Sequence, residues 1–133
     1  MANSEQLNRA KAFLRKAEEY LASCSDNLES ERFTPAAGNA IHAGISAKDA
    51  ISTALTGTTQ KKRDHAAAAK ELRTALGRRP EAAAAEKSLR ELIAAKAAVE
   101  YGTALTTKVK AEGLLRRAQT LVDLAVEVVS LRG

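Results

Sequence analysis

Residues 34–57 read TPAAGNAIHAGISAKDAISTALTG, a stretch that begins and ends like an α-helix. Thr34 can cap a helix with its hydroxyl, and Pro35 suits the first helical position because an N–H there has no helical partner. Gly57 suits the C-terminal cap, since glycine adopts the left-handed conformation at little cost. In between, apolar residues recur at spacings of three and four, and many of them are small. The stretch therefore predicts a helix that neighbouring helices can approach closely.

One further helix is predicted before this stretch and three are predicted after it. Asn3, with Gln6 three residues later, forms a capping-box pattern before an amphipathic stripe. Asp64 is placed to cap a short helix that ends before Gly77. Gly102 separates the last two helices. The expected helices span residues 3–29, 34–56, 64–76, 81–101 and 107–131.

Composition excludes most other classes of fold. The 133 residues include 29 alanines but only four aromatic residues, seven Gly and two Pro, which disfavours a β-sandwich or barrel. No apolar run reaches the roughly 18 residues that cross a bilayer, and residues 1–5 do not resemble the start of a signal peptide. One cysteine forms no intramolecular disulfide, which favours a reducing, cytoplasmic location. We expect one domain over residues 1–133, an all-α antiparallel four-helix bundle with an additional short helix.

The apolar end of the chain has two interpretations. Val128, Val129 and Leu131 extend the stripe of the last predicted helix almost to the C-terminus. They would suit a dimer interface if they extend beyond the core of one chain and remain exposed. They would equally serve to cover the first helix.

Positive charge is concentrated in the second half of the chain. Residues 1–60 carry six Lys/Arg against seven Asp/Glu, a net charge of −1, whereas residues 61–133 carry fifteen against nine, a net charge of +6. The excess includes the clusters Lys61-Lys62-Arg63, Arg78-Arg79 and Arg116-Arg117. Such clusters either bind phosphates or form an ordinary solvated surface.

A polar stripe on the 34–56 helix is the first candidate site. Asn39, His42, Ser46 and Asp49 follow one another at spacings of three, four and three, so they share one helical face. This face is either a polar groove or the solvent-exposed face of an ordinary amphipathic helix.

The other potentially reactive residues are weaker candidates for a functional site. His42 and His65 lie on separate predicted helices, and Cys24 lies on an apolar stripe, so neither zinc nor a reactive thiol is expected. Lys96 lies one turn from the end of its helix, where a cation complements the helix dipole. Tyr101 can pack its ring while its hydroxyl meets a polar partner.

Several of these segments together resemble the HEPN domain (higher eukaryote and prokaryote nucleotide-binding), in particular its small stand-alone actinobacterial members. As in that family, an acid–His pair, Asp64-His65, opens a short helix after a loop, and Lys96 precedes Tyr101 near the end of a later helix. Residues 10–21 are similar to the family's first helix and residues 39–50 to its second. The resemblance covers residues 7–130.

The resemblance implies a four-helix bundle with an extra short helix, commonly a homodimer. Many members are metal-independent ribonucleases that use an Arg followed, after four to six residues, by a His. Neither His42 nor His65 has an Arg or Lys at that distance before it, and the matching position here reads Lys96, four residues, Tyr101. A tyrosine hydroxyl is a poorer general base at neutral pH than an imidazole. We therefore do not expect an enzyme.

These observations lead to one functional hypothesis and two alternatives. We expect a non-catalytic HEPN-like bundle that binds RNA, a nucleotide or another phosphate-bearing ligand, without a cofactor, a metal or a membrane. The first alternative is a protein-interaction module that docks a toxin, an antitoxin or a nucleotidyltransferase. The second is a ribonuclease with a degenerate site. The candidate ligand-binding residues are Asn39, His42, Ser46, Asp49, Lys61, Lys62, Arg63, His65, Lys96 and Tyr101.

Overall fold

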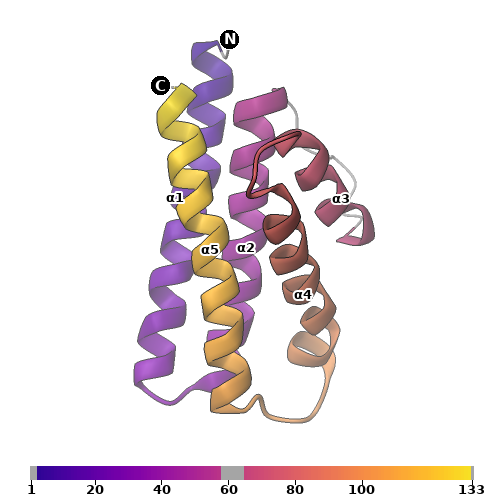
Figure 1. The fold of residues 1–133 in the computed structure, drawn as a ribbon. Coiled ribbons are helices and arrows are strands. Elements are labelled where there is room, and N and C mark those ends of the chain that lie inside the picture. The colour runs from indigo at the N-terminus through magenta and orange to yellow at the C-terminus, as the bar shows by residue number, and fades with distance from the viewer. Residues whose placement is uncertain (1–2, 58–64, 133) are drawn as a thin grey trace.

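Five α-helices form the described part of the chain, residues 3–57 and 65–132 of a computed structural model (Figure 1). The predicted all-α class, with four long helices and one short one, is confirmed. Each helix begins and ends within about one residue of its expected bounds. In chain order they are α1 (Ser4–Glu29), α2 (Phe33–Thr56), α3 (His65–Leu76), α4 (Ala82–Tyr101) and α5 (Lys108–Arg132).

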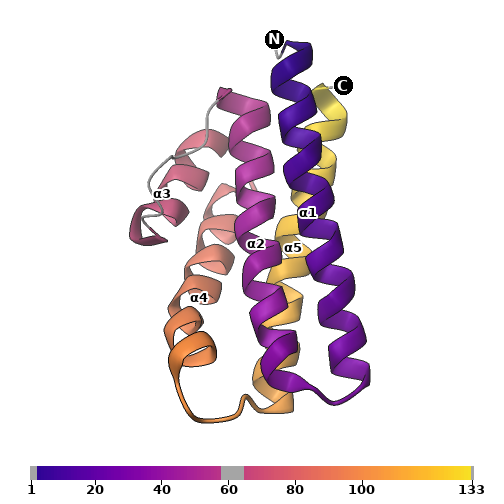
Figure 2. The same ribbon diagram turned by 180° about the vertical axis from the view of Figure 1, so that it is seen from behind.

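The four long helices alternate in direction along the chain (Figures 1 and 2). α2 and α5 run the same way and contact each other across one diagonal of the bundle. α1 and α4 occupy the other diagonal and do not contact each other within the described ranges. The short α3 lies outside the bundle against α2 and α4. α2 is therefore the central helix, because it contacts all four of the others.

Small side chains allow α2 to occupy this central position. Most of its apolar residues are alanines that are fully buried or nearly so. At Gly44 the approach is closest, since a Cβ added there would lie 2.5 Å from Leu92 Cδ1 of α4 and 3.4 Å from Leu121 Cδ1 of α5. A larger residue at position 44 would push these leucines away. The prediction that neighbouring helices approach α2 closely is confirmed.

Two predicted helix ends are confirmed. Asn3 caps α1, because its Oδ1 accepts a hydrogen bond from the Gln6 backbone N–H at 2.7 Å. Gly57 ends α2 in the left-handed conformation, with φ of 80°. The Gln6 side chain has a different role from the one expected. Its Nε2 donates to the carbonyls of Thr53 and Ala54 at 2.9 and 3.2 Å, so it satisfies two carbonyls in the last turn of α2.

The predicted cap at Thr34 is wrong. α2 begins one residue earlier, at Phe33, and its N-cap residue Arg32 makes no capping hydrogen bond through its side chain. The Thr34 hydroxyl instead accepts a hydrogen bond from the Thr106 backbone N–H at 3.0 Å. A distant connection, the one between α4 and α5, therefore uses the oxygen that was expected to cap α2.

The apolar end of α5 lies mostly inside the chain's own core. Val128 and Val129 are buried on α5, which contacts α1 and α2, while Leu131 is exposed. Val128 and Val129 therefore belong to the core of this chain, and Leu131 extends beyond it. None of the helices in the described ranges has the length and apolar character needed to span a membrane.

Candidate functional site

The polar stripe of α2 divides among several partners. Asn39 Oδ1 accepts a hydrogen bond from the Asn27 amide of α1 at 2.8 Å. Ser46 is buried. His42 and Asp49 belong to two separate clusters, described below. The residues of this face therefore meet different neighbours, because side chains from α1, α3 and α4 contact it at different heights.

His42 lies in a cluster built by α1, α2 and α4. Its ring stacks on Tyr20, with centroids 5.3 Å apart, and its Nε2 lies 3.0 Å from Glu100 Oε1. Lys96, one turn earlier on α4, donates to Glu100 Oε2, and its Nζ lies 5.7 Å from the centre of the Tyr101 ring. These five residues are called the His42 cluster from here on. It unites three of the predicted site residues, His42, Lys96 and Tyr101.

Glu100 is the acidic centre of the His42 cluster. The hydrogen bond from Lys96 is the main cause that lowers the pKa of Glu100 below its ordinary value of 4.5, and partial burial opposes it. Within the described ranges, Oε1 of Glu100 is a buried oxygen with no hydrogen-bond partner except the nearby imidazole of His42. The carboxylate is therefore ionised at neutral pH, and it holds the ammonium of Lys96 beside the imidazole.

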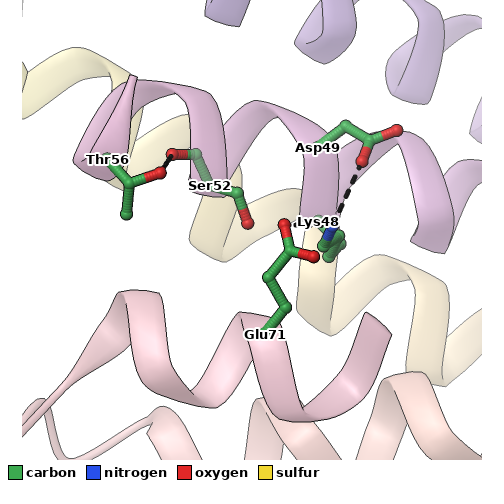
Figure 3. Close-up of polar contacts among 5 residues, drawn as sticks. All are labelled: Lys48, Asp49, Ser52, Thr56 and Glu71. Atoms are coloured by element: carbon green, nitrogen blue, oxygen red, sulfur yellow. Dashed lines mark hydrogen bonds and ion pairs between the residues drawn. The ribbon is translucent and has the colours of Figure 1, made fainter. Parts of the chain in front are cut away.

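Asp49 lies in a second cluster, between α2 and α3 (Figure 3). Lys48 is only 3% exposed, and its Nζ lies 2.7 Å from Glu71 Oε1 of α3 and 3.5 Å from Asp49 Oδ1. One turn further along, the Thr56 hydroxyl donates to the Ser52 carbonyl at 2.7 Å. A buried ammonium between two carboxylates attaches the short α3 to the central helix. The arrangement is a structural ion pair, and a ligand would have to displace it.

Three of the predicted ligand-binding residues lie outside the described ranges, and of a fourth only the backbone is described. Lys61, Lys62 and Arg63 lie outside the described residues, as does the predicted capping residue Asp64. His65 is the first residue of α3, but its side chain also lies outside the description.

A groove between α4 and α5 has a volume of about 480 Å³. Arg117 joins its two walls, because its Nε donates to Glu91 of α4 and its guanidinium also donates to the Gly113 carbonyl at 2.8 Å. This hollow is called the α4–α5 groove below. It is lined by Glu91, Ala94, Ala95, Val109, Lys110, Gly113, Leu114, Arg116 and Arg117.

The single cysteine is buried, as its place on an apolar stripe predicted. Burial raises the pKa of Cys24 to about 11, and a backbone hydrogen bond involving Ala40 opposes the rise only in part. A thiol in this state carries little thiolate at neutral pH and is a weak nucleophile. In the described ranges, no group of three or more His, Cys, Asp and Glu side chains could hold a metal ion.

Sequence reasoning missed the residues that connect the helices. Glu100 lies four residues after Lys96, a spacing typical of a helical ion pair, so it could have been found. Nothing in the sequence singles out Tyr20 as a partner of His42. The burial of Lys48 had no indication in the sequence, because lysine is almost always exposed. Its partner Glu71 depends on where α3 lies.

No protein-family model matches the chain, and the comparisons with curated proteins and with solved structures also gave no significant match.

Proposed function

We propose that this chain is a non-catalytic, HEPN-like bundle that binds a phosphate-bearing ligand, RNA or a nucleotide, at the His42 cluster. The observation that supports this function best is the contact of His42 on α2 and Lys96 on α4 with the same carboxylate, Glu100. Both side chains are hydrogen-bond donors when charged, and both are held at one place on the surface. Four long helices with one short one are also the architecture that the resemblance implies.

Glu100 occupies the position that a phosphate would take. A phosphate group carries more negative charge and more acceptor oxygens than a carboxylate, so it can replace Glu100 as the partner of Lys96 and His42. Tyr101 is 79% exposed and its ring lies near the ammonium of Lys96, where a base can stack on it. Lys96 and His42 would then bind the phosphate, and Tyr101 would hold the base or the sugar beside it.

Binding rather than cleavage is proposed because of the residue types. General acid–base cleavage of RNA requires a group that exchanges protons near neutral pH at the reacting oxygen. The matching family position holds Tyr101, and the only imidazole in the cluster, His42, is directed at Glu100. Incubation of the pure protein with RNA should therefore leave the RNA intact. Metal-independent cleavage that is lost in Lys96→Ala and Tyr101→Phe would contradict the non-catalytic part of the proposal.

Binding can be tested by fluorescence anisotropy with a labelled single-stranded RNA and a labelled ATP. Binding should strengthen as salt falls from about 200 to 20 mM, because the contacts are between charges. Glu100→Gln should tighten binding, since it releases Lys96 and His42 from their competitor. Lys96→Ala should weaken it severalfold or more.

Matched variants separate the site from general charge. Lys87→Ala removes the same charge from an exposed position on α4, and Glu18→Gln removes a carboxylate from an exposed position on α1. Neither should change the affinity by more than a small factor. The proposal is wrong if neither ligand binds at the lowest salt, or if Lys87→Ala weakens binding as much as Lys96→Ala.

A second candidate function, a protein-interaction module, is favoured by a different observation. Tyr101, Leu105 and Val109 are large apolar residues that are 79, 85 and 76% exposed at the turn from α4 to α5. Exposed apolar residues gathered in one place are typical of a protein-binding surface.

A further inference from the structure

The groove between α4 and α5 is lined by both apolar and positively charged residues. Ala94 and Ala95 of α4 and Val109 and Leu114 of α5 form the apolar part of the α4–α5 groove. Tyr101 and Leu105 extend exposed apolar surface along the connection that leads from α4 to Val109.

The charges around the groove are not balanced within the chain. Three cations, Lys110, Arg116 and Arg117, line it against one carboxylate, Glu91. Arg117 and Glu91 neutralise each other, and their ion pair fixes the spacing of α4 and α5. Lys110 and Arg116 have no acidic partner among the described residues. Two positive charges therefore remain for a partner beside an apolar floor.

We infer that the α4–α5 groove binds an acidic amphipathic helix of a partner protein. Apolar side chains at every third or fourth position of that helix would contact Ala94, Val109 and Leu114, as in other helix-in-groove complexes. Asp and Glu side chains flanking this stripe would meet Lys110 and Arg116. This inference does not rest on the phosphate site, because none of the residues that line the groove belongs to the His42 cluster.

Charge favours such a partner over a second copy of the chain. In a symmetric dimer the same patch lies on both partners. A dimer formed through this groove would therefore bring the unpaired cations of one chain toward those of the other. An acidic helix would complement them instead.

The direct test is titration of the full chain with labelled amphipathic peptides of about 18 residues, long enough for five helical turns. One peptide has a leucine stripe flanked by Glu and Asp, and the second has the same stripe flanked by Lys. A third keeps the acids and replaces the leucines with serine. The first peptide should bind at least tenfold more tightly than the other two. Equal binding of the first two, or no binding of the first, would overturn the inference.

Variants show whether the peptide uses the groove. Val109→Asp and Arg116→Glu are exposed changes that should leave the fold intact, and each should reduce binding of the acidic peptide at least tenfold. Lys11→Glu makes the same charge reversal at an exposed position of α1 and should have little effect. Unchanged binding by both groove variants would contradict the assignment. So would sedimentation showing a dimer of the chain that Val109→Asp dissociates, because a second copy would then cover the groove.

Discussion

Two alanine-rich helices, α2 and α4, have very different surroundings. Every alanine of α2 is buried, because four helices contact it. The alanines of α4 divide into a buried set and an exposed set, because α2, α3 and α5 cover only part of that helix. The exposed set is Ala83, Ala84, Ala94, Ala97 and Ala98.

The difference shows that alanine specifies a helix without specifying where the helix lies. Its high helix propensity stabilises α2 and α4 equally, whereas its small side chain buries little area in either. Position in the bundle then decides the role. α2 is surrounded and positions the other helices, whereas α4 has one covered side and both proposed binding surfaces. Lys96 and Glu100 belong to the surface that meets α2, and Ala94 belongs to the surface that meets α5.

The largest effect on the free energy of unfolding is expected for a substitution on the covered side of α4. Leu92 is fully buried and contacts the Gly44 region of α2, so Leu92→Ala should lower the free energy of unfolding by about 2–5 kcal/mol. Leu105→Ala, at an exposed position, should change it by less than about 0.5 kcal/mol. Urea denaturation followed by circular dichroism measures both. Similar values for the two variants would mean that Leu92 does not lie in a filled core between α4 and α2.

Removal of the buried charge of Lys48 on α2 should have the next largest effect on the free energy of unfolding. Lys48→Met removes the ammonium between Glu71 and Asp49 and leaves two partly exposed carboxylates near each other. We expect a loss of about 1–3 kcal/mol, less than for a fully buried pair because water reaches both acids. The double variant Lys48→Met with Glu71→Gln should recover part of it. Lys11→Met, at an exposed position of α1, should cost little. A negligible loss in Lys48→Met would show that this ion pair does not hold α3.

Two glycines of α2 test how closely its neighbours approach. Gly44→Ala should destabilise the protein by about 1–2 kcal/mol, because the new methyl group would overlap Leu92 in a filled core. Gly38→Ala should stabilise it by about 0.5–1 kcal/mol, since nothing lies within 4 Å of the added Cβ and alanine is the better helix former. Thermal unfolding should show a lower melting temperature for Gly44→Ala and a higher one for Gly38→Ala. Shifts of the same sign would contradict this.

The smallest effect is expected for Glu100 of α4, whose contribution to the free energy of unfolding depends on pH. The pKa of Glu100 is lower in the folded chain than its ordinary 4.5, so its contribution is present above that value and is lost as pH falls through the lowered pKa. Glu100→Gln should therefore cost about 0.5 kcal/mol at neutral pH and nothing in strong acid. Urea denaturation across this pH range measures it, with Glu18→Gln as the control. A difference that persists unchanged in acid would exclude the ionised pair as its cause.

The sequence predicted relations within a helix better than relations between helices. The capping residues Asn3 and Gly57 were found because the local chain determines them. The cap at Thr34 failed because Thr106, which is far away in sequence, takes its hydroxyl. The spacing of the polar stripe correctly placed four residues on one face of α2, but it could not reveal that Glu100 would meet His42 and Glu71 would meet Lys48. Those contacts depend on how the helices pack.

The claim that α4 carries two separate binding surfaces is tested most directly by nuclear magnetic resonance of the labelled full chain. Titration with ATP should shift the backbone resonances around His42, Lys96 and Glu100. Titration with the acidic peptide should instead shift those around Ala94, Val109 and Arg116, and a mixture should give both sets together. One shared set of shifts, or small shifts spread over all basic residues, would contradict the account.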